Sequence, residues 1–151
     1  MERRSQTGGY TLIELMIVLA IIGVLVVLAS SIVITFQTRS KQAEVKTNLA
    51  AIGNTAETYF TEKDTYATDF NGLGWGPQGL TRYSYFYGTD TRARTHPDAP
   101  DTTGTVPAGV AASSTSFTAG ASANLDADPT IDQWTYNNQR VLVNVVNDAT
   151  Q

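Results

Sequence analysis

A single carboxylate, Glu14, lies at the start of a long apolar run and is the residue of this sequence best placed to do chemistry. From Leu15 to Phe36 no side chain is ionisable, and as a helix this stretch would reach about 33 Å, enough to cross a bilayer core. A carboxylate in such a helix costs free energy, on the order of 3 kcal/mol at mid-bilayer and less near the interface. We therefore expect Glu14 to meet a cation, because pairing offsets part of the desolvation of both charges.

A short polar leader precedes this run. Residues 1–9 read MERRSQTGG, with two arginines and two terminal glycines. The residues from Gly9 to Glu14, GYTLIE, resemble the processing site GFTLIE of type IV prepilins, with Tyr10 in place of the usual Phe. The resemblance implies that a membrane peptidase cuts between Gly9 and Tyr10 and methylates the new amine of Tyr10. It also implies that Glu14 meets the terminal amine of a neighbouring subunit during filament assembly.

An ordinary secretory signal is the competing interpretation of the same segment. The leader arginines would then form its basic region, residues 15–28 its apolar core and residues 27–29 (VLA) its cleavage site. Glu14 interrupts the apolar onset, however, and apolar character resumes at residues 32–34 instead of giving way to a mature domain. The pattern therefore favours the prepilin interpretation.

The sequence permits one continuous helix from Tyr10 to about Lys63, because no proline occurs before Pro77. Residues 10–36 would be its transmembrane and filament-core half, and residues 37–63 its amphipathic half. Apolar residues in the second half recur at spacings of 4, 3, 4 and 3, a single helical stripe: Val45, Leu49, Ile52, Ala56 and Tyr59. Gly53, inside this half, would let another backbone approach the helix. Ser30-Ser31 occupies the place where many prepilin relatives have a proline linked to local helix melting, which puts such melting in doubt here.

After Asp64 the composition indicates strands and loops, so we expect a β-rich head at residues 64–151. The expected strands are residues 82–88, 114–121, 133–136 and 141–146. In the first of them, alternation places three tyrosines on one face: Tyr83, Tyr85 and Tyr87. The proline-rich residues 95–113 are typical of a long exposed loop. The predicted fold class is α+β, a long N-terminal helix packed on a small antiparallel sheet of three or four strands.

Three carboxylates near the end of the chain are the candidate metal ligands: Asp126, Asp128 and Asp132. Calcium favours such oxygen clusters, and the related pseudopilins of type II secretion bind calcium in a comparable region. Turns flanking a strand explain the same residues without a metal. With no cysteine and a single histidine, His96, the sequence offers no catalytic triad and no His- or Cys-based metal site. We expect no enzyme activity and no cofactor.

A loop that matches G-x-G-x-x-G, residues 74–79, is not expected to bind nucleotides, because a proline interrupts it and a strand follows it. Without the leader the chain carries 8 basic and 13 acidic side chains, since two of the 10 arginines and lysines and one of the 14 acidic residues lie in it. That net charge of −5 argues against nucleic-acid binding.

Residues 46–70 and the segments FTAGASANLDAD and DQWTYNNQRVLVN are similar to major pilins of deltaproteobacterial type. The resemblance implies a pilus subunit for attachment and twitching motility. Its implied partners are identical subunits in a helical filament, the prepilin peptidase, an inner-membrane assembly platform and, before assembly, the lipid bilayer. The protein would stand in the inner membrane as a single-pass precursor and become extracellular in the filament. A type II secretion pseudopilin, or a membrane-anchored ligand- or calcium-binding module that never polymerises, are the alternatives.

Overall fold

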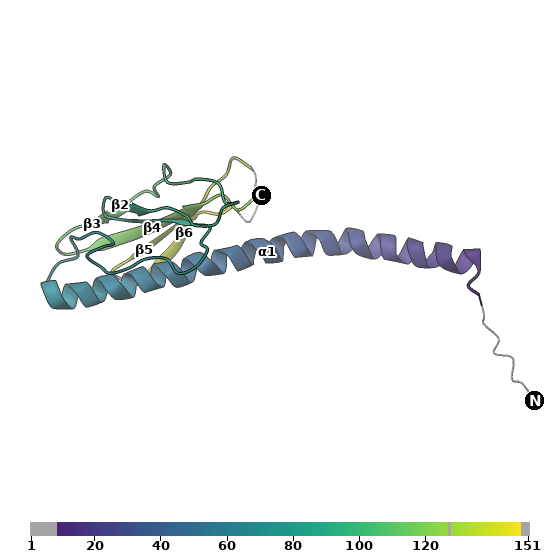
Figure 1. The fold of residues 1–151 in the computed structure, drawn as a ribbon, viewed down its shortest axis with the longest axis horizontal. Helices are drawn as coiled ribbons and strands as arrows, with labels where there is room; N and C mark the ends of the chain where they lie inside the picture. Colours follow the sequence, from purple (N-terminus) through teal and green to yellow (C-terminus); the bar gives the residue numbers. More distant parts are fainter. Residues whose placement is uncertain (1–8, 127, 149–151) are drawn as a thin grey trace, which may run out of the picture. The chain divides into compact units, whose positions relative to one another are not determined.

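The computed structural model describes residues 9–126 and 128–148, and over residues 29–35 it describes the backbone alone. The chain forms one helix and a six-stranded sheet (Figure 1). The elements are α1 (Leu12–Lys63), β1 (Ser84–Tyr87), β2 (Asp90–Arg92), β3 (Ala111–Ala112), β4 (Phe117–Ala123), β5 (Asp132–Asn137) and β6 (Leu142–Val146). Two compact units divide the chain, an N-terminal unit (Met1–Gln37) and a C-terminal unit (Thr38–Gln151).

The helix α1 is 52 residues long and is continuous in its hydrogen bonding, as the absence of proline allows. It begins two residues later than expected, at Leu12, and ends at Lys63. Asp64 then takes a left-handed conformation with a φ of 54°, and its N–H donates to the Phe60 carbonyl oxygen at 2.8 Å. A left-handed residue after the last turn is a common way to stop a helix.

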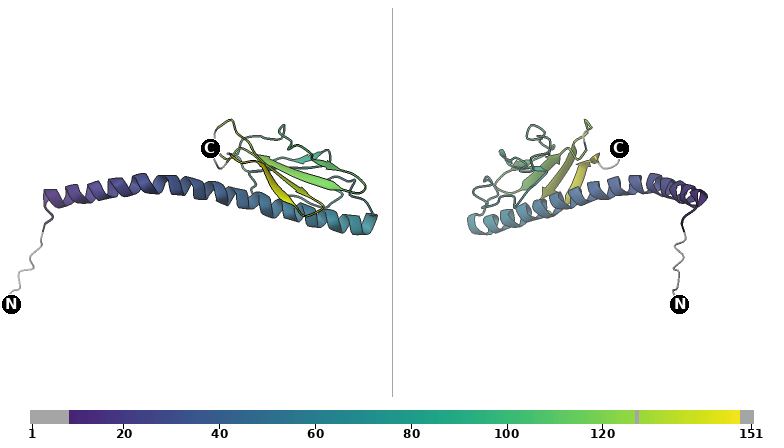
Figure 2. Two further views of the ribbon diagram at one scale, coloured as in Figure 1. Left: turned by 180° about the vertical axis from the view of Figure 1, so that it is seen from behind. Right: turned by 45° about the vertical axis from the view of Figure 1, so that its right-hand side comes forward.

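The sheet is antiparallel, with the strand order β2-β1-β4-β5-β6 (Figure 2). The short strand β3 pairs with Phe117 and Thr118, at the N-terminal end of β4. The α+β class and the helix-on-sheet arrangement are confirmed, and four of the six strands lie where the sequence predicts them. The prediction of three or four strands missed β2 and β3. These strands have only three and two residues, too few for an alternating apolar pattern to be visible.

The core of the C-terminal unit lies between the second half of α1 and the sheet. The stripe residues Val45, Leu49, Ile52 and Ala56 are fully buried, and Tyr59 is partly buried beside them. Tyr83, Tyr85 and Tyr87 all belong to this core, so the alternation in β1 is confirmed. Gly53 has a different role from the expected one: a Cβ there would lie 2.2 Å from a ring carbon of Tyr136, so a side chain and not a backbone approaches the helix.

The proline-rich segment does not form the expected exposed loop throughout, because it covers part of the outer face of the sheet. Thr102 is buried, and its hydroxyl donates to the Ser122 carbonyl oxygen in β4 at 2.8 Å. Gly120 has room for this packing only because it lacks a side chain, since a Cβ would lie 2.4 Å from Val110. Phe86, on the same outer face, is therefore buried as well. Small residues and a buried threonine, not apolar alternation, hold the segment in place.

Candidate functional site

The N-terminal end of α1 is closed by a reciprocal pair of residues, Thr11 and Glu14. The Thr11 N–H and hydroxyl donate to Glu14 Oε2 at 2.8 and 2.7 Å, and the Glu14 N–H donates to Thr11 Oγ1 at 3.3 Å. This is a capping box, which satisfies backbone donors that the first turn of a helix leaves without a partner. Glu14 Oε1 accepts no hydrogen bond from the described residues, so the carboxylate retains an oxygen for a further partner. The sequence pattern Thr-x-x-Glu at residues 11–14 predicts a capping box, and the sequence analysis did not identify it.

The expected processing site lies just before the helix. Gly9 and Tyr10 have no regular secondary structure, and the Tyr10 side chain is 85% exposed. The remaining leader residues, 1–8, lie outside the described residues, so the structure bears only on this end of the predicted site. An exposed peptide bond outside regular secondary structure is accessible to a peptidase.

The first turns of α1 expose apolar side chains on every side. Each leucine, isoleucine, valine and methionine from Leu12 to Leu28 is at least 48% exposed within the chain. A helix that is apolar all round is characteristic of an element that is buried by other molecules or by lipid. Of the helical residues that the structure describes, no stretch is both long enough and apolar enough to cross a membrane.

Comparisons with known proteins match the same region and the one that follows it. Residues 4–30 match the family model described as the prokaryotic N-terminal methylation motif, and residues 36–96 match the model of type IV pilin PilA. The chain is 43% identical over 125 residues to the type IV major pilin protein PilA of Myxococcus xanthus (strain DK1622). These matches show that the chain is similar to type IV pilins. The match covers 81% of this chain and 55% of the Myxococcus protein, so the chain spans about half the length of that curated relative.

The three aspartates that the sequence singled out do not form one cluster. Asp126 and Asp128 lie in the loop between β4 and β5, whereas Asp132 is fully buried at the start of β5. Asp132 Oδ2 accepts hydrogen bonds from the Tyr83 hydroxyl and from Trp134 Nε1, both at 2.6 Å. Its other oxygen accepts from Gln42, Asn144 and the Asp148 N–H at 3.2 to 3.3 Å. Both oxygens of Asp132 are thus used in the core, which makes it a poor metal ligand.

The buried Asp132 carboxylate also affects the pKa of the neighbouring Tyr83 hydroxyl. Burial raises the pKa of the Tyr83 hydroxyl far above its usual range, and the charge of Asp132 and the hydrogen bond to it raise that pKa further. Tyr83, the residue directly before β1, is therefore a permanent donor to Asp132 at the start of β5. This is a structural network of hydrogen bonds inside the core.

In place of Asp132, the structure brings Asp148 to the other two aspartates. One carboxylate oxygen from each of Asp126, Asp128 and Asp148 lies within 4.8 Å of the others. The hairpin that the sequence predicts from residues 133–136 and 141–146 is the feature that could have placed Asp148 near the other two aspartates. Because β5 and β6 are antiparallel, with Gln133 opposite Val146, a residue just after β6 lies beside the loop that precedes β5.

A second carboxylate that the sequence reasoning did not single out, Glu44, anchors β1 to α1. Its Oε1 accepts from the Arg82 N–H and the Tyr85 hydroxyl, both at 3.1 Å. Burial raises the pKa of the Tyr85 hydroxyl, and the charge of Glu44 raises it further. Tyr85 therefore stays protonated and donates to Glu44 across the interface between helix and strand.

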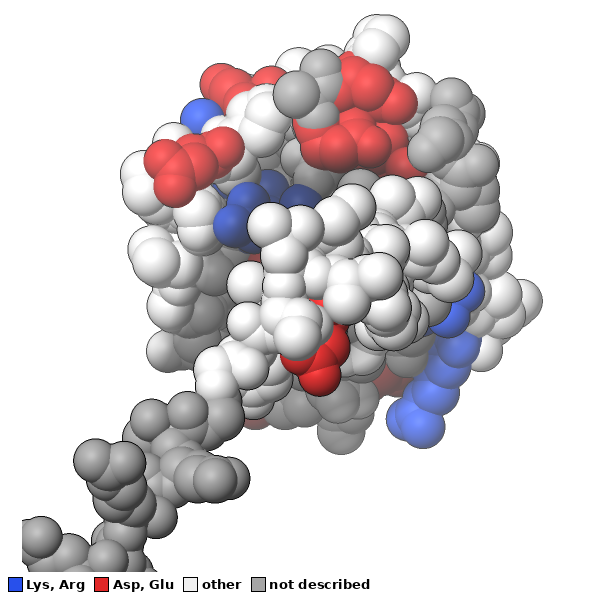
Figure 3. All heavy atoms as spheres, turned by 90° about the vertical axis from the view of Figure 1, so that its right-hand side faces the viewer, with Lys and Arg blue, Asp and Glu red and all other residues white. Residues whose placement is uncertain are grey.

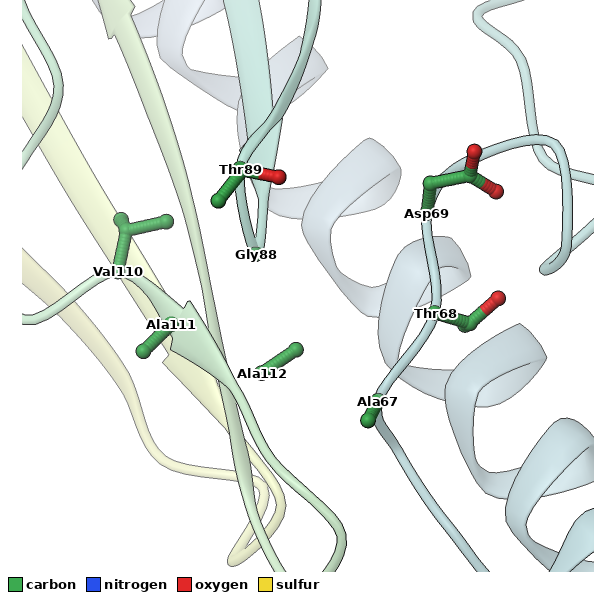
Figure 4. A pocket seen from close by; sticks show the side chains of 8 residues that line it. All are labelled: Ala67, Thr68, Asp69, Gly88, Thr89, Val110, Ala111 and Ala112. Carbon is green, nitrogen blue, oxygen red and sulfur yellow. The ribbon is translucent and has the colours of Figure 1, made fainter.

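An open groove of about 590 Å³ lies beside β3 (Figure 4). It is bounded by residues 67–69, by Gly88 and Thr89 of the β1–β2 turn and by residues 110–112. Asp69 is the one ionisable residue among its lining side chains, and its Oδ1 accepts the Gly72 N–H at 2.7 Å. Two threonine hydroxyls, of Thr68 and Thr89, are the other polar side-chain groups in its lining.

Proposed function

We propose that this chain is the structural subunit of a type IV pilus and that it polymerises through the N-terminal part of α1. The observation that carries the proposal is the all-round exposed apolar surface from Leu12 to Leu28, directly after a processing motif. Burying a leucine or isoleucine side chain of this kind contributes about 1.5–3 kcal/mol. Packing of these helices against one another in a filament would therefore supply a large driving force for assembly.

Glu14 would set the register between neighbouring subunits in that filament. Its Oε1 is available while Oε2 remains in the capping box with Thr11. The methylated amine of Tyr10 from a neighbouring subunit is the cation that we propose for this oxygen. Among apolar helices an unpaired carboxylate is costly, so only the register that pairs it would be stable.

Processing between Gly9 and Tyr10 by a prepilin peptidase would create that amine. Until then the N-terminal unit would hold the precursor in the inner membrane as a single-pass segment, residues 10–36, and the assembly platform there would pass subunits to an extracellular filament. The relative from Myxococcus is named a major pilin, which favours a pilus used for attachment and twitching motility over a secretion pseudopilin.

Two measurements in a pilus-assembling host that lacks its own major pilin test the proposal. Electron microscopy and mass spectrometry of sheared surface filaments should identify this chain as the main subunit, and its intact mass should correspond to residues 10–151 with one N-methyl group. Retention of residues 1–9, or an N-terminus at Ser30, would exclude prepilin processing.

The role of Glu14 is tested by its replacement in the same host. Glu14→Ala should leave membrane insertion and cleavage intact and reduce filament yield at least tenfold, because the partner amine then has no acceptor in an apolar core. Glu62→Ala is the matched control, since Glu62 is an exposed glutamate at the other end of α1. A wild-type filament yield from Glu14→Ala would contradict the proposed register role.

A further inference from the structure

Three carboxylates from two separate segments converge at one end of the C-terminal unit. Asp126 and Asp128 come from the β4–β5 loop and Asp148 from the segment after β6. Each uses one oxygen locally: Asp126 accepts the Asp128 N–H at 3.1 Å, Asp128 accepts the Thr130 N–H at 2.6 Å and Asp148 accepts the Leu125 N–H at 2.8 Å. One oxygen of each aspartate is thus already a hydrogen-bond acceptor.

The strongest sign of a missing partner is Asp148. This residue is only 1% exposed, yet its Oδ1 has no hydrogen-bond partner among the described residues. No described lysine or arginine forms an ion pair with any of the three aspartates. A buried carboxylate oxygen with no donor costs free energy, and two further negative charges within 4.8 Å increase that cost.

We propose that Asp126, Asp128 and Asp148 bind one calcium ion. Calcium takes six to eight oxygen ligands in flexible geometry, so three carboxylates, waters and nearby amide or carbonyl oxygens suit it. Asn124 is a candidate fourth ligand, because its Nδ2 donates to the Asp128 carbonyl oxygen while its Oδ1 is buried with no hydrogen-bond partner among the residues that the structure describes. Zinc would favour histidine or cysteine, and neither belongs to this cluster.

The ion would connect two segments that the sheet alone does not join. One is the loop that holds Asp126 and Asp128, and the other is the segment after β6. Lys41 of α1 also donates to the Leu125 carbonyl oxygen, so the loop already contacts the helix at this end. In the face of the molecule that Figure 3 shows, acidic side chains gather at the top of the view. Calcium would thus stabilise the C-terminal unit against local opening.

Calorimetric titration of the full-length chain in detergent micelles, after removal of metals with EDTA, tests the site. Calcium should bind at one site per chain, with a dissociation constant of about 10⁻⁴–10⁻³ M, as in other extracellular modules, and magnesium should bind at least about tenfold more weakly. Calcium should also raise the unfolding temperature of the C-terminal unit. Because the readout is binding by the single subunit, it does not depend on whether filaments form.

Substitutions of the proposed ligands distinguish this site from nonspecific electrostatic binding of calcium. Asp126→Asn and Asp148→Asn should each weaken calcium binding about tenfold or more and abolish the thermal shift, because each removes a charged ligand. Asp98→Asn, at an exposed position of the proline-rich segment, is the matched control and should bind as the wild type does. Asp126 is exposed, so Asp126→Asn decides the matter if Asp148→Asn fails to fold. The proposal is overturned by absence of binding at millimolar calcium, by equal binding of magnesium, or by wild-type affinity in Asp126→Asn.

Discussion

The two halves of α1 differ in what surrounds their apolar side chains. In the N-terminal unit Leu19 is 68% exposed, whereas in the C-terminal unit Leu49 is fully buried against the sheet. The same residue type in the same helix is thus mostly exposed in one half and fully buried in the other. The C-terminal unit completes its own core. The apolar side chains of the N-terminal unit are exposed, as the proposed polymerisation through this part of α1 requires.

The most direct test of this difference between the two halves of α1 is to truncate the helix. A fragment that begins at Arg39 keeps the stripe Val45 to Tyr59, and we expect a cooperatively folded, soluble monomer that does not polymerise. A fragment that begins at Asp64 loses the four fully buried side chains of the stripe. The three larger ones, Val45, Leu49 and Ile52, are worth roughly 5–9 kcal/mol together, comparable to the whole stability of a small domain. It should unfold or aggregate, as circular dichroism and gel filtration would report. Equal stability of the two fragments would show that the helix is not part of the core.

The second test removes the polar centre of the C-terminal unit. Asp132→Ala should lower the free energy of unfolding by about 3 kcal/mol or more, because it leaves several buried donors without an acceptor, including those of Tyr83 and Trp134. Chemical denaturation of the Arg39 fragment measures the loss. Asp98→Ala, at an exposed aspartate, serves as the control and should change stability by less than about 0.5 kcal/mol. A similarly small loss in Asp132→Ala would mean that the network contributes little.

The third test makes the same substitution in both halves of α1. Leu49→Ala should destabilise the C-terminal unit by about 2–5 kcal/mol, because it opens a cavity in a packed core. Leu19→Ala should leave the unfolding of that unit unchanged and lower filament yield instead. Thermal unfolding of the full-length chain and quantification of sheared filaments give the two readouts. If Leu19→Ala destabilised the C-terminal unit as much as Leu49→Ala, the division between the halves would be wrong.

These tests rest on elements that differ in how visible they are in the sequence. Spacing alone predicts the buried stripe and the tyrosine alternation, because a helix and a strand each impose a fixed period on the residues that face a core. Thr102 and Gly120 carry no periodic signal, since their roles depend on which loop covers which strand. Asp148 was missed for a related reason: its neighbours in space come from a hairpin register that is fixed only once the strands pair.

Gly53 gives the smallest and most specific test. Gly53→Ala improves helix propensity by about 1 kcal/mol, yet the new Cβ would lie 2.2 Å from a ring carbon of Tyr136. Displacing that ring from the core should cost more, so we expect a net loss of about 1–2 kcal/mol in the Arg39 fragment. In the background of Tyr136→Ala the clash is absent, and the same substitution should become stabilising. A double-mutant cycle of the four proteins measures this coupling. If Gly53→Ala had the same effect with and without the Tyr136 ring, then the glycine would not be required for β5 to pack on α1.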